Sequence, residues 1–149
     1  GAWLIRIARR LGVPVLASEQ YPQGLGHTVA AIRELLPAEA FVEKTHFSCA
    51  AERECMRRID ALGRHRVVVI GAEAHVCVLQ TALDLRAAGK EVYLVADAVS
   101  SRSPRDVELA LERMRAEGVR VVSREMVAFE WLHQAGTDRF REISREFLR

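Results

Sequence analysis

Cys77 is the residue of this sequence whose type and position most favour a reaction site. It stands six residues after Gly71, where the apolar run from Val67 ends and a helix is expected to begin. Amide N–H groups and the positive end of a helix dipole converge at such a turn, where they stabilise a thiolate or an oxyanion. The alternative is a small apolar residue packed in the turn, and position alone leaves both interpretations open.

Lys44 is the second candidate, because it ends the apolar run FVEK that is expected to form a short strand. A lysine at the carboxyl end of a buried strand is partly desolvated, so it could act as a general acid or pair with a thiolate. The alternative is an ordinary solvated lysine. In favour of the chemical interpretation, Lys44 and Cys77 both fall at the carboxyl edge of the expected sheet.

The other candidates are weaker. His75 lies two residues before Cys77, but side chains at that spacing in a turn usually diverge, so we expect a structural or substrate-facing histidine rather than a dyad. Cys49 and Cys55 are expected to be packing residues. The five histidines form neither an HxH nor an HExxH array, and the segment GLG is too short for a phosphate-binding loop, so we expect neither metal nor cofactor.

Composition indicates one globular domain. The chain has 149 residues, of which 50% are apolar and 28% charged, with a net charge of +2. This charge favours neither a nucleic-acid groove nor a membrane surface, and no apolar run approaches the ~20 residues of a membrane span. No signal peptide is visible, and three cysteines without a CxxC pair favour a reducing compartment. We therefore expect a cytoplasmic protein.

The elements that must position the candidates alternate between strand and helix, which predicts an α/β fold with a mostly parallel sheet. The strand runs are apolar throughout, as expected when helices cover both faces. In such folds ligands bind beyond the carboxyl ends of the strands. The expected strands are Val13–Gln20, Phe41–Thr45, Arg66–Glu73, Glu91–Val99 and Val119–Glu125. The expected helices are residues 3–11, 28–36 (capped by Thr28), 50–62 (capped by Ser48), 77–88, 104–117 (capped by Ser103) and two short helices near the C-terminus.

Four segments in order resemble the isochorismatase-like cysteine hydrolase superfamily. They are VLASEQYPQGLG, VEKTHFSC, VIGAEAHVCVLQTALDL and the stretch from VYLVADAVSSRSPRD to VAFEW. The similarity is strongest to the isochorismatase domain-containing proteins. The resemblance implies a three-layer α/β/α sandwich with a doubly wound, six-stranded, mostly parallel sheet.

The resemblance also implies an Asp–Lys–Cys triad, with Lys44 as its lysine and Cys77 as its nucleophile. In this family the cysteine attacks the carbonyl carbon of a small amide or a related molecule. The implied oxyanion hole consists of the backbone amides of Ala74 and Cys77, and a cis peptide is implied between Ala72 and Glu73. The activity implied is that of an amidase-type hydrolase with a small-molecule substrate.

The sequence departs from the family pattern at the aspartate. The family places it in a DxQ-like motif at the end of a first strand, and no such motif occurs here, because the chain begins with what resembles the following helix. We therefore expect residues 1–149 to form one N-terminally incomplete domain, with a gap where the absent strand would lie in the middle of the sheet. On this expectation a non-catalytic binding or scaffold protein of the same fold is the alternative function.

A second departure concerns the metal. Nicotinamidases of this superfamily hold a metal with an Asp-x-His element, where this chain has Glu19 and Tyr21, so no metal is expected. Glu19, Gln20, Tyr21 and His75 are expected to line the substrate pocket instead. Isochorismate hydrolysis is less favoured, because it does not need a cysteine nucleophile in the same way. The family also implies a homo-oligomer, and the aromatic C-terminal segment could pack within the chain or on a neighbouring subunit.

Overall fold

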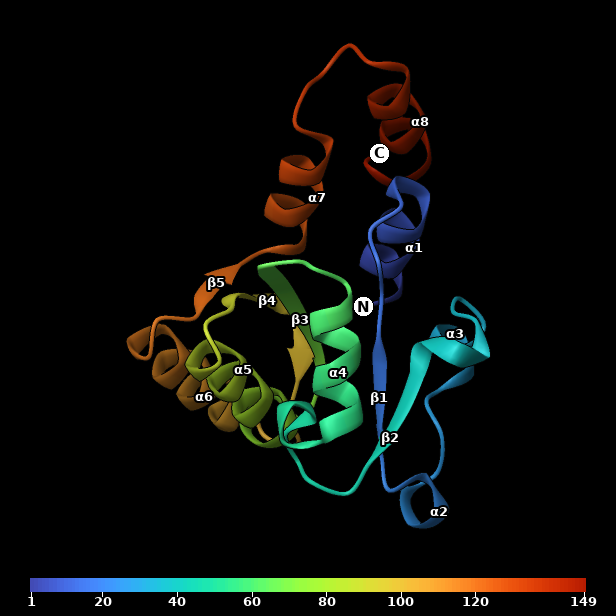
Figure 1. Ribbon diagram of the computed structural model, residues 1–149. Coiled ribbons are helices and arrows are strands. Elements are labelled where there is room, and N and C mark those ends of the chain that lie inside the picture. Colours follow the sequence, from blue (N-terminus) through green and yellow to red (C-terminus); the bar gives the residue numbers. More distant parts are fainter.

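The computed structural model describes residues 1–149 as an α/β fold with parallel strands and interleaved helices (Figure 1). The strands are β1 (Ala17–Gln20), β2 (Phe41–Lys44), β3 (Arg66–Ala72), β4 (Glu91–Ser100) and β5 (Arg120–Val122). The α-helices are α1 (Ala2–Leu11), α2 (Pro22–Leu25), α3 (Ala30–Arg33), α4 (Arg53–Ala61), α5 (Leu79–Ala87), α6 (Pro104–Ala116), α7 (Arg124–Leu132) and α8 (Asp138–Phe147). Shorter turns are the 3₁₀-helices η1 (Ala38–Ala40) and η2 (Cys49–Ala51) and the π-helical η3 (Ala74–Val78).

The strands form two separate parallel sheets, so the single continuous sheet of the family is not what this chain forms. One sheet pairs β1 with β2, and the other has the order β3–β4–β5. Within the chain, β1 therefore pairs with no strand other than β2, and β3 with none other than β4. The division leaves one edge of β1 and one edge of β3 without a ladder partner in the chain.

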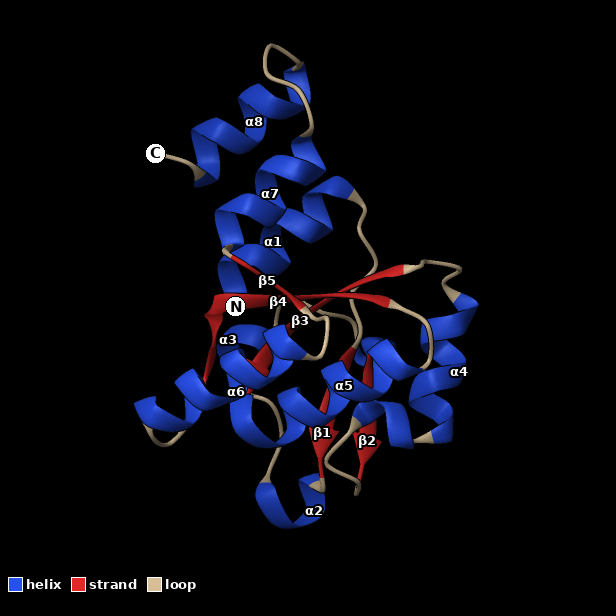
Figure 2. Ribbon diagram, turned by 90° about the vertical axis from the view of Figure 1, so that its left-hand side faces the viewer, coloured by secondary structure: helices blue, strands red, loops and turns tan.

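Helices cover both faces of the three-stranded sheet, which confirms the expected layers. In Figure 2, α1, α7 and α8 lie on one side of β3–β5, and α5 and α6 lie on the other. The larger core cluster joins α5, β4 and α6, where Leu85, Leu94 and Met114 are at most 1% exposed. No helix combines the length and apolar character that a membrane crossing requires.

Helix α1 packs against both sheets. Its Leu4 contacts the cluster of Val95 and Val122 on β4 and β5, whereas the neighbouring Ile5 contacts a cluster that includes Ala17 of β1 and Ile70 of β3. Because the sheets share no backbone ladder, this apolar packing is one of the contacts that set their relative position.

The C-terminal segment packs within the chain. Ile143 of α8 is 2% exposed and lies in a cluster with Ile7 of α1 and Leu132 of α7. The indole Nε1 of Trp3 donates a hydrogen bond to the carbonyl oxygen of Phe147 at 3.0 Å. Of the two sites foreseen for this aromatic segment, the fold provides the intrachain one.

Several expected elements are shorter than the sequence pattern predicts. The first strand begins at Ala17 rather than Val13, and the last ends at Val122 because Ser123 caps α7, its hydroxyl accepting from Met126 N at 3.2 Å. The cap proposed for Thr28 is wrong, since α3 begins after Val29 and has no side-chain cap. Apolar runs report burial, whereas these ends are decided by which carbonyl and amide groups find partners.

Burial in the α5–β4–α6 cluster gives a direct test of the fold. Leu85→Ala should lower the free energy of unfolding by about 2–5 kcal/mol, because a 1% exposed side chain is replaced by a cavity. Leu109→Ala makes the same change on α6 at a site that is 45% exposed and should cost less than about 1 kcal/mol. Urea unfolding of both variants measures the difference, and equal losses would contradict this packing.

Candidate active site

Lys44 is a buried ammonium with every donor satisfied. It ends β2, is 5% exposed, and donates to the carbonyl oxygens of Phe47 at 2.6 Å and His46 at 3.2 Å. Its third partner is Oε1 of Gln20. A lysine ammonium has three donors, so these three oxygens account for all of them and compensate for the loss of water.

Gln20 joins this lysine to the cysteine. It ends β1 and lies opposite Lys44 in the parallel register of β1 and β2. Its Nε2 donates to the carbonyl oxygen of Thr45 at 2.7 Å, which directs Oε1 towards Lys44. The same Oε1 lies 3.8 Å from Sγ of Cys77, within reach of a weak S–H···O hydrogen bond. The structure thus brings together Lys44 and Gln20, at the carboxyl ends of β2 and β1, and Cys77, which follows β3.

Cys77 lies on the π-helical turn η3, which leads directly into α5. The turn follows Gly71, whose φ of 132° disfavours any residue with a side chain, and the peptide bond between Ala72 and Glu73 is cis, at the position that the resemblance implies. Within η3, Ala74 is fully buried, whereas Cys77 is partly exposed. The turn therefore packs into the core through Ala74 and leaves the thiol of Cys77 partly accessible to solvent.

The loop that supplies the carbonyls for Lys44 is held by Glu52, a residue that the sequence patterns missed. One oxygen of Glu52 accepts from the backbone amides of Thr45 at 2.9 Å and His46 at 3.0 Å, and lies 2.9 Å from Nδ1 of His46. The hydrogen bonds from His46 and Thr45 lower the pKa of Glu52 to about 2. A single glutamate therefore fixes the course of the segment that cages the ammonium.

A further hydrogen bond ties the lysine loop to the helix after the cysteine. The backbone amide of Cys49, in η2, donates to Oγ1 of Thr81 in α5 at 2.9 Å. Cys49 and Cys55 are buried in one cluster with Val42, as expected for packing residues. The hydrogen bond from the Cys55 thiol lowers the pKa of Cys49, and the same contact together with burial raises that of Cys55.

Glu19 has a different environment from its neighbour Gln20. It is 6% exposed and accepts from Arg33 at 3.0 Å and from the amide of Thr28 at 3.2 Å, with Nδ1 of His27 at 2.9 Å. Burial alone would raise the pKa of Glu19, but the bonds from His27 and Thr28 and the charge of Arg33 outweigh it and lower that pKa. Its carboxylate therefore fastens the segment that follows β1.

Tyr21 begins that segment in a left-handed conformation, with φ of 38°. Its amide donates to the carbonyl of Lys44 at 2.7 Å, and its side chain is 52% exposed. The ring lies so close to Gly24 that a Cβ there would stand 2.4 Å from Cε1, so a larger residue at this position would displace the ring. Tyr21 is thus beside Lys44 at the backbone level, and its place in a substrate pocket stays a prediction.

His75 makes its contacts away from the thiol. Its Nδ1 lies 2.9 Å from Oγ of Ser101, beyond the end of β4, and 3.4 Å from a carboxylate oxygen of Glu73. The expectation that Cys77 and His75 form no dyad agrees with these partners. No group of three or more His, Cys, Asp or Glu side chains is arranged to hold a metal ion.

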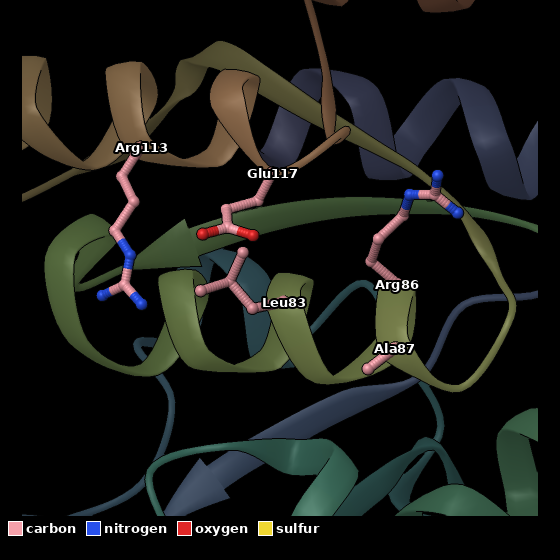
Figure 3. A pocket seen from close by; sticks show the side chains of 5 residues that line it. All are labelled: Leu83, Arg86, Ala87, Arg113 and Glu117. Atoms are coloured by element: carbon pink, nitrogen blue, oxygen red, sulfur yellow. The ribbon is translucent and has the colours of Figure 1, made fainter.

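A surface hollow of about 340 Å³ lies elsewhere, between α5 and α6 (Figure 3). It is lined by Leu83, Arg86, Ala87, Arg113 and Glu117. These residues precede the amino ends of β4 and β5, at the edge of the sheet away from the ends of β1, β2 and β3. The hollow has no nucleophilic side chain, and Cys77 is not among its lining residues.

The fold and this arrangement define a class of α/β protein with a cysteine and a buried lysine at the carboxyl ends of parallel strands. Residues 2–126 match the profile of the family described as the Isochorismatase domain, and the chain belongs to that family.

Named relatives support this assignment. Isochorismatase domain-containing protein 1 of Salmo salar is 42% identical over 143 residues, covering 96% of this chain and 50% of that protein. Isochorismatase domain-containing protein 2 of Macaca fascicularis is 40% identical, covering 97% and 69%. The chain spans about half the length of the salmon protein and of its Danio rerio counterpart.

Solved structures confirm the fold. The MAR1 ribonuclease of Caenorhabditis elegans superposes with a TM-score of 0.90 at 36% identity, covering 99% of this chain and 76% of that one. The YcaC gene product of Escherichia coli, described as an octameric hydrolase of unknown specificity, gives 0.90 at 19% identity, covering 98% and 74%. The chain thus has the fold of the isochorismatase-like hydrolases.

The lowered pKa of Glu19 gives a pH-dependent prediction. Because its folded pKa is depressed, Glu19 stabilises the protein above the unfolded value of about 4.3, and this stabilisation is lost as pH falls through the folded value. Glu19→Gln should therefore cost about 1–3 kcal/mol at pH 7 and distinctly less near pH 3.

Glu54→Gln is the matched control, since Glu54 pairs with Arg57 and Arg58 on the exposed surface of α4. That change should have little effect at pH 7, because exposed pairs are screened by water and salt. Urea unfolding at both pH values gives the comparison. A Glu19→Gln loss that does not shrink in acid would contradict the described ion pairs.

Proposed function

We propose that this protein is a cysteine hydrolase that acts on a small amide or a related small molecule with an electrophilic carbon. The observation that carries the proposal is the meeting of the Lys44 ammonium and the Cys77 thiol at the two sides of one oxygen, Oε1 of Gln20. A buried positive charge near a thiol favours the thiolate, which is the nucleophilic form.

In the proposed reaction the sulfur of Cys77 attacks the carbonyl carbon, and the carbonyl π electrons move onto its oxygen. Backbone amides of Ala74 and Cys77 stabilise that oxyanion. Collapse of the intermediate expels the amine, which takes a proton from a general acid, and leaves a thioester on Cys77. Water activated by a general base then releases the acid product and the thiol. Gln20 and Tyr21 border the proposed pocket, whereas Glu19 and His75 hold the segments beside it through Arg33 and Ser101.

We assign the general acid and base to an aspartate on a further strand seated between β1 and β3. The separate sheets support this, since each of these strands has one edge without a ladder partner in the chain. Ala17 and Ile70, one from each strand, border the same apolar cluster, so a strand placed there would be covered by α1. Residues 1–149 would then be one domain completed by that strand.

A binding protein without catalysis is the second candidate, and it is favoured because no carboxylate that could move a proton is among the hydrogen-bond partners of Lys44 and Cys77. The name of the nematode relative adds RNA to the ligands worth testing. We keep a small molecule as the substrate, since a thiol beside a buried lysine suits nucleophilic attack on an electrophilic carbon. The octamer of the bacterial YcaC supports the proposal that this chain forms a homo-oligomer. The three cysteines form no disulfide, which supports a reducing, cytoplasmic location.

Iodoacetamide labelling with peptide mapping tests the proposed nucleophile. Cys77 should be alkylated first, because Cys49 and Cys55 are 7% and 0% exposed. Lys44→Met should slow alkylation of Cys77 by about tenfold or more at pH 7, since it removes the nearby charge. Lys90→Met is the control, because Lys90 pairs with Asp60 on the surface of α4.

Turnover of a panel of small amides and esters, with a short RNA as an additional substrate, tests the reaction itself. Cys77→Ser should abolish any carbonyl hydrolysis, while Lys90→Met should retain it. The role of Cys77 as the nucleophile would be refuted if iodoacetamide alkylated it no faster than a free thiol and if Lys44→Met did not change that rate. RNA cleavage that survives Cys77→Ser would point to a different activity.

A further inference from the structure

The turn that carries Cys77 contacts the loop after β4 through two side chains. Nδ1 of His75 lies 2.9 Å from the hydroxyl of Ser101. A carboxylate oxygen of Glu73 accepts from the backbone amide of Arg102 at 3.1 Å, and the guanidinium Nε of Arg102 lies 3.7 Å away. These are polar contacts between segments 26 and 29 residues apart in the chain.

Only one edge of the His75 ring makes these contacts. The carboxylate of Glu73 is 3.4 Å from Nδ1, on the same edge as Ser101. On the other edge, Nε2 is 3.8 Å from a carboxylate oxygen of Asp106 in α6, which is too long for a hydrogen bond. A serine hydroxyl both donates and accepts, so the bond between Nδ1 and Ser101 forms in either tautomer of the ring.

The two sides of η3 are held by different forces. Ala74 and Val78 are buried in the core cluster shared with α5, β4 and α6, so apolar packing fixes the inner side of the turn. His75 has 21% of its side chain exposed, and Cys77 is partly exposed. At His75 the outer side is fixed by the polar contact with Ser101.

We infer that His75 is the positioning residue for Cys77, and that it acts by anchoring η3 to Ser101 through Nδ1. The inference rests on the proposed function, because it gives His75 the role of holding the nucleophile Cys77 in place and not that of contacting the substrate. The rate at which a thiol is alkylated depends on its thiolate fraction, and that fraction depends on its distance from a nearby positive charge such as that of Lys44. Loss of the anchor should therefore reduce the reactivity of Cys77 without unfolding the core beneath it.

Two substitutions at His75 separate anchoring from general packing. Asn places its amide near the position of Nδ1, whereas Gln places its amide near Nε2. In His75→Asn, iodoacetamide should alkylate Cys77 within about twofold of the parent rate, and in His75→Gln about tenfold more slowly. Ser101→Ala removes the same hydrogen bond from the other side and should match His75→Gln.

Asp106→Asn is the control, since its contact with Nε2 is too long to anchor the ring, and its alkylation rate should be unchanged. The measurement is the rate of iodoacetamide labelling at Cys77, with the melting temperature of each variant recorded beside it. Equal slowing of His75→Asn and His75→Gln, or parent rates in both His75→Gln and Ser101→Ala, would overturn the inference. Failure of the proposed function would look different. In that case the parent protein itself would be labelled slowly at Cys77, and Lys44→Met would not change the labelling rate.

Discussion

The burial of the Lys44 ammonium is the constraint on which the site depends. A charged amine cut off from water is tolerated only when each N–H has an oxygen partner. Here those oxygens come from the end of β1 and from two backbone carbonyls after β2. The register of β1 with β2 supplies the first, and the hydrogen bonds of Glu52 shape the loop that supplies the others. The charge is therefore fixed in place by backbone geometry.

The cysteine comes from the other sheet, so its distance from this charge depends on how the sheets are joined. No backbone ladder connects β1 with β3. Helix α1 packs against both sheets, and the bond from Cys49 N to Thr81 links the lysine loop to α5, directly after the turn that carries Cys77. Gln20 adds a polar contact to each side. Apolar packing sets the approximate spacing, and these directional bonds near the site refine it.

The sequence patterns predicted the order of strands and helices, the glycine after α1 and the carboxyl-edge positions of Lys44 and Cys77. They did not predict that Glu52 would bind the backbone of the loop after Lys44, or that Ser101 would form a hydrogen bond with His75. Periodicity reports which residues face a core, and motifs report residue types at short range. The bond between His75 and Ser101 spans 26 residues, and that between Cys77 and Gln20 spans 57, so neither has a local signature.

Glu19 and Gln20 show how strand geometry divides two adjacent polar residues between support and chemistry. Successive side chains of a strand point to opposite faces, so neighbours cannot serve the same site. Gln20 lies towards Lys44 and Cys77, whereas Glu19 binds Arg33, His27 and the amide of Thr28. The segment fastened by Glu19 begins with Tyr21, whose amide bonds to the carbonyl of Lys44. Glu19 therefore supports the lysine from the far face of β1, by holding the chain that packs beside it.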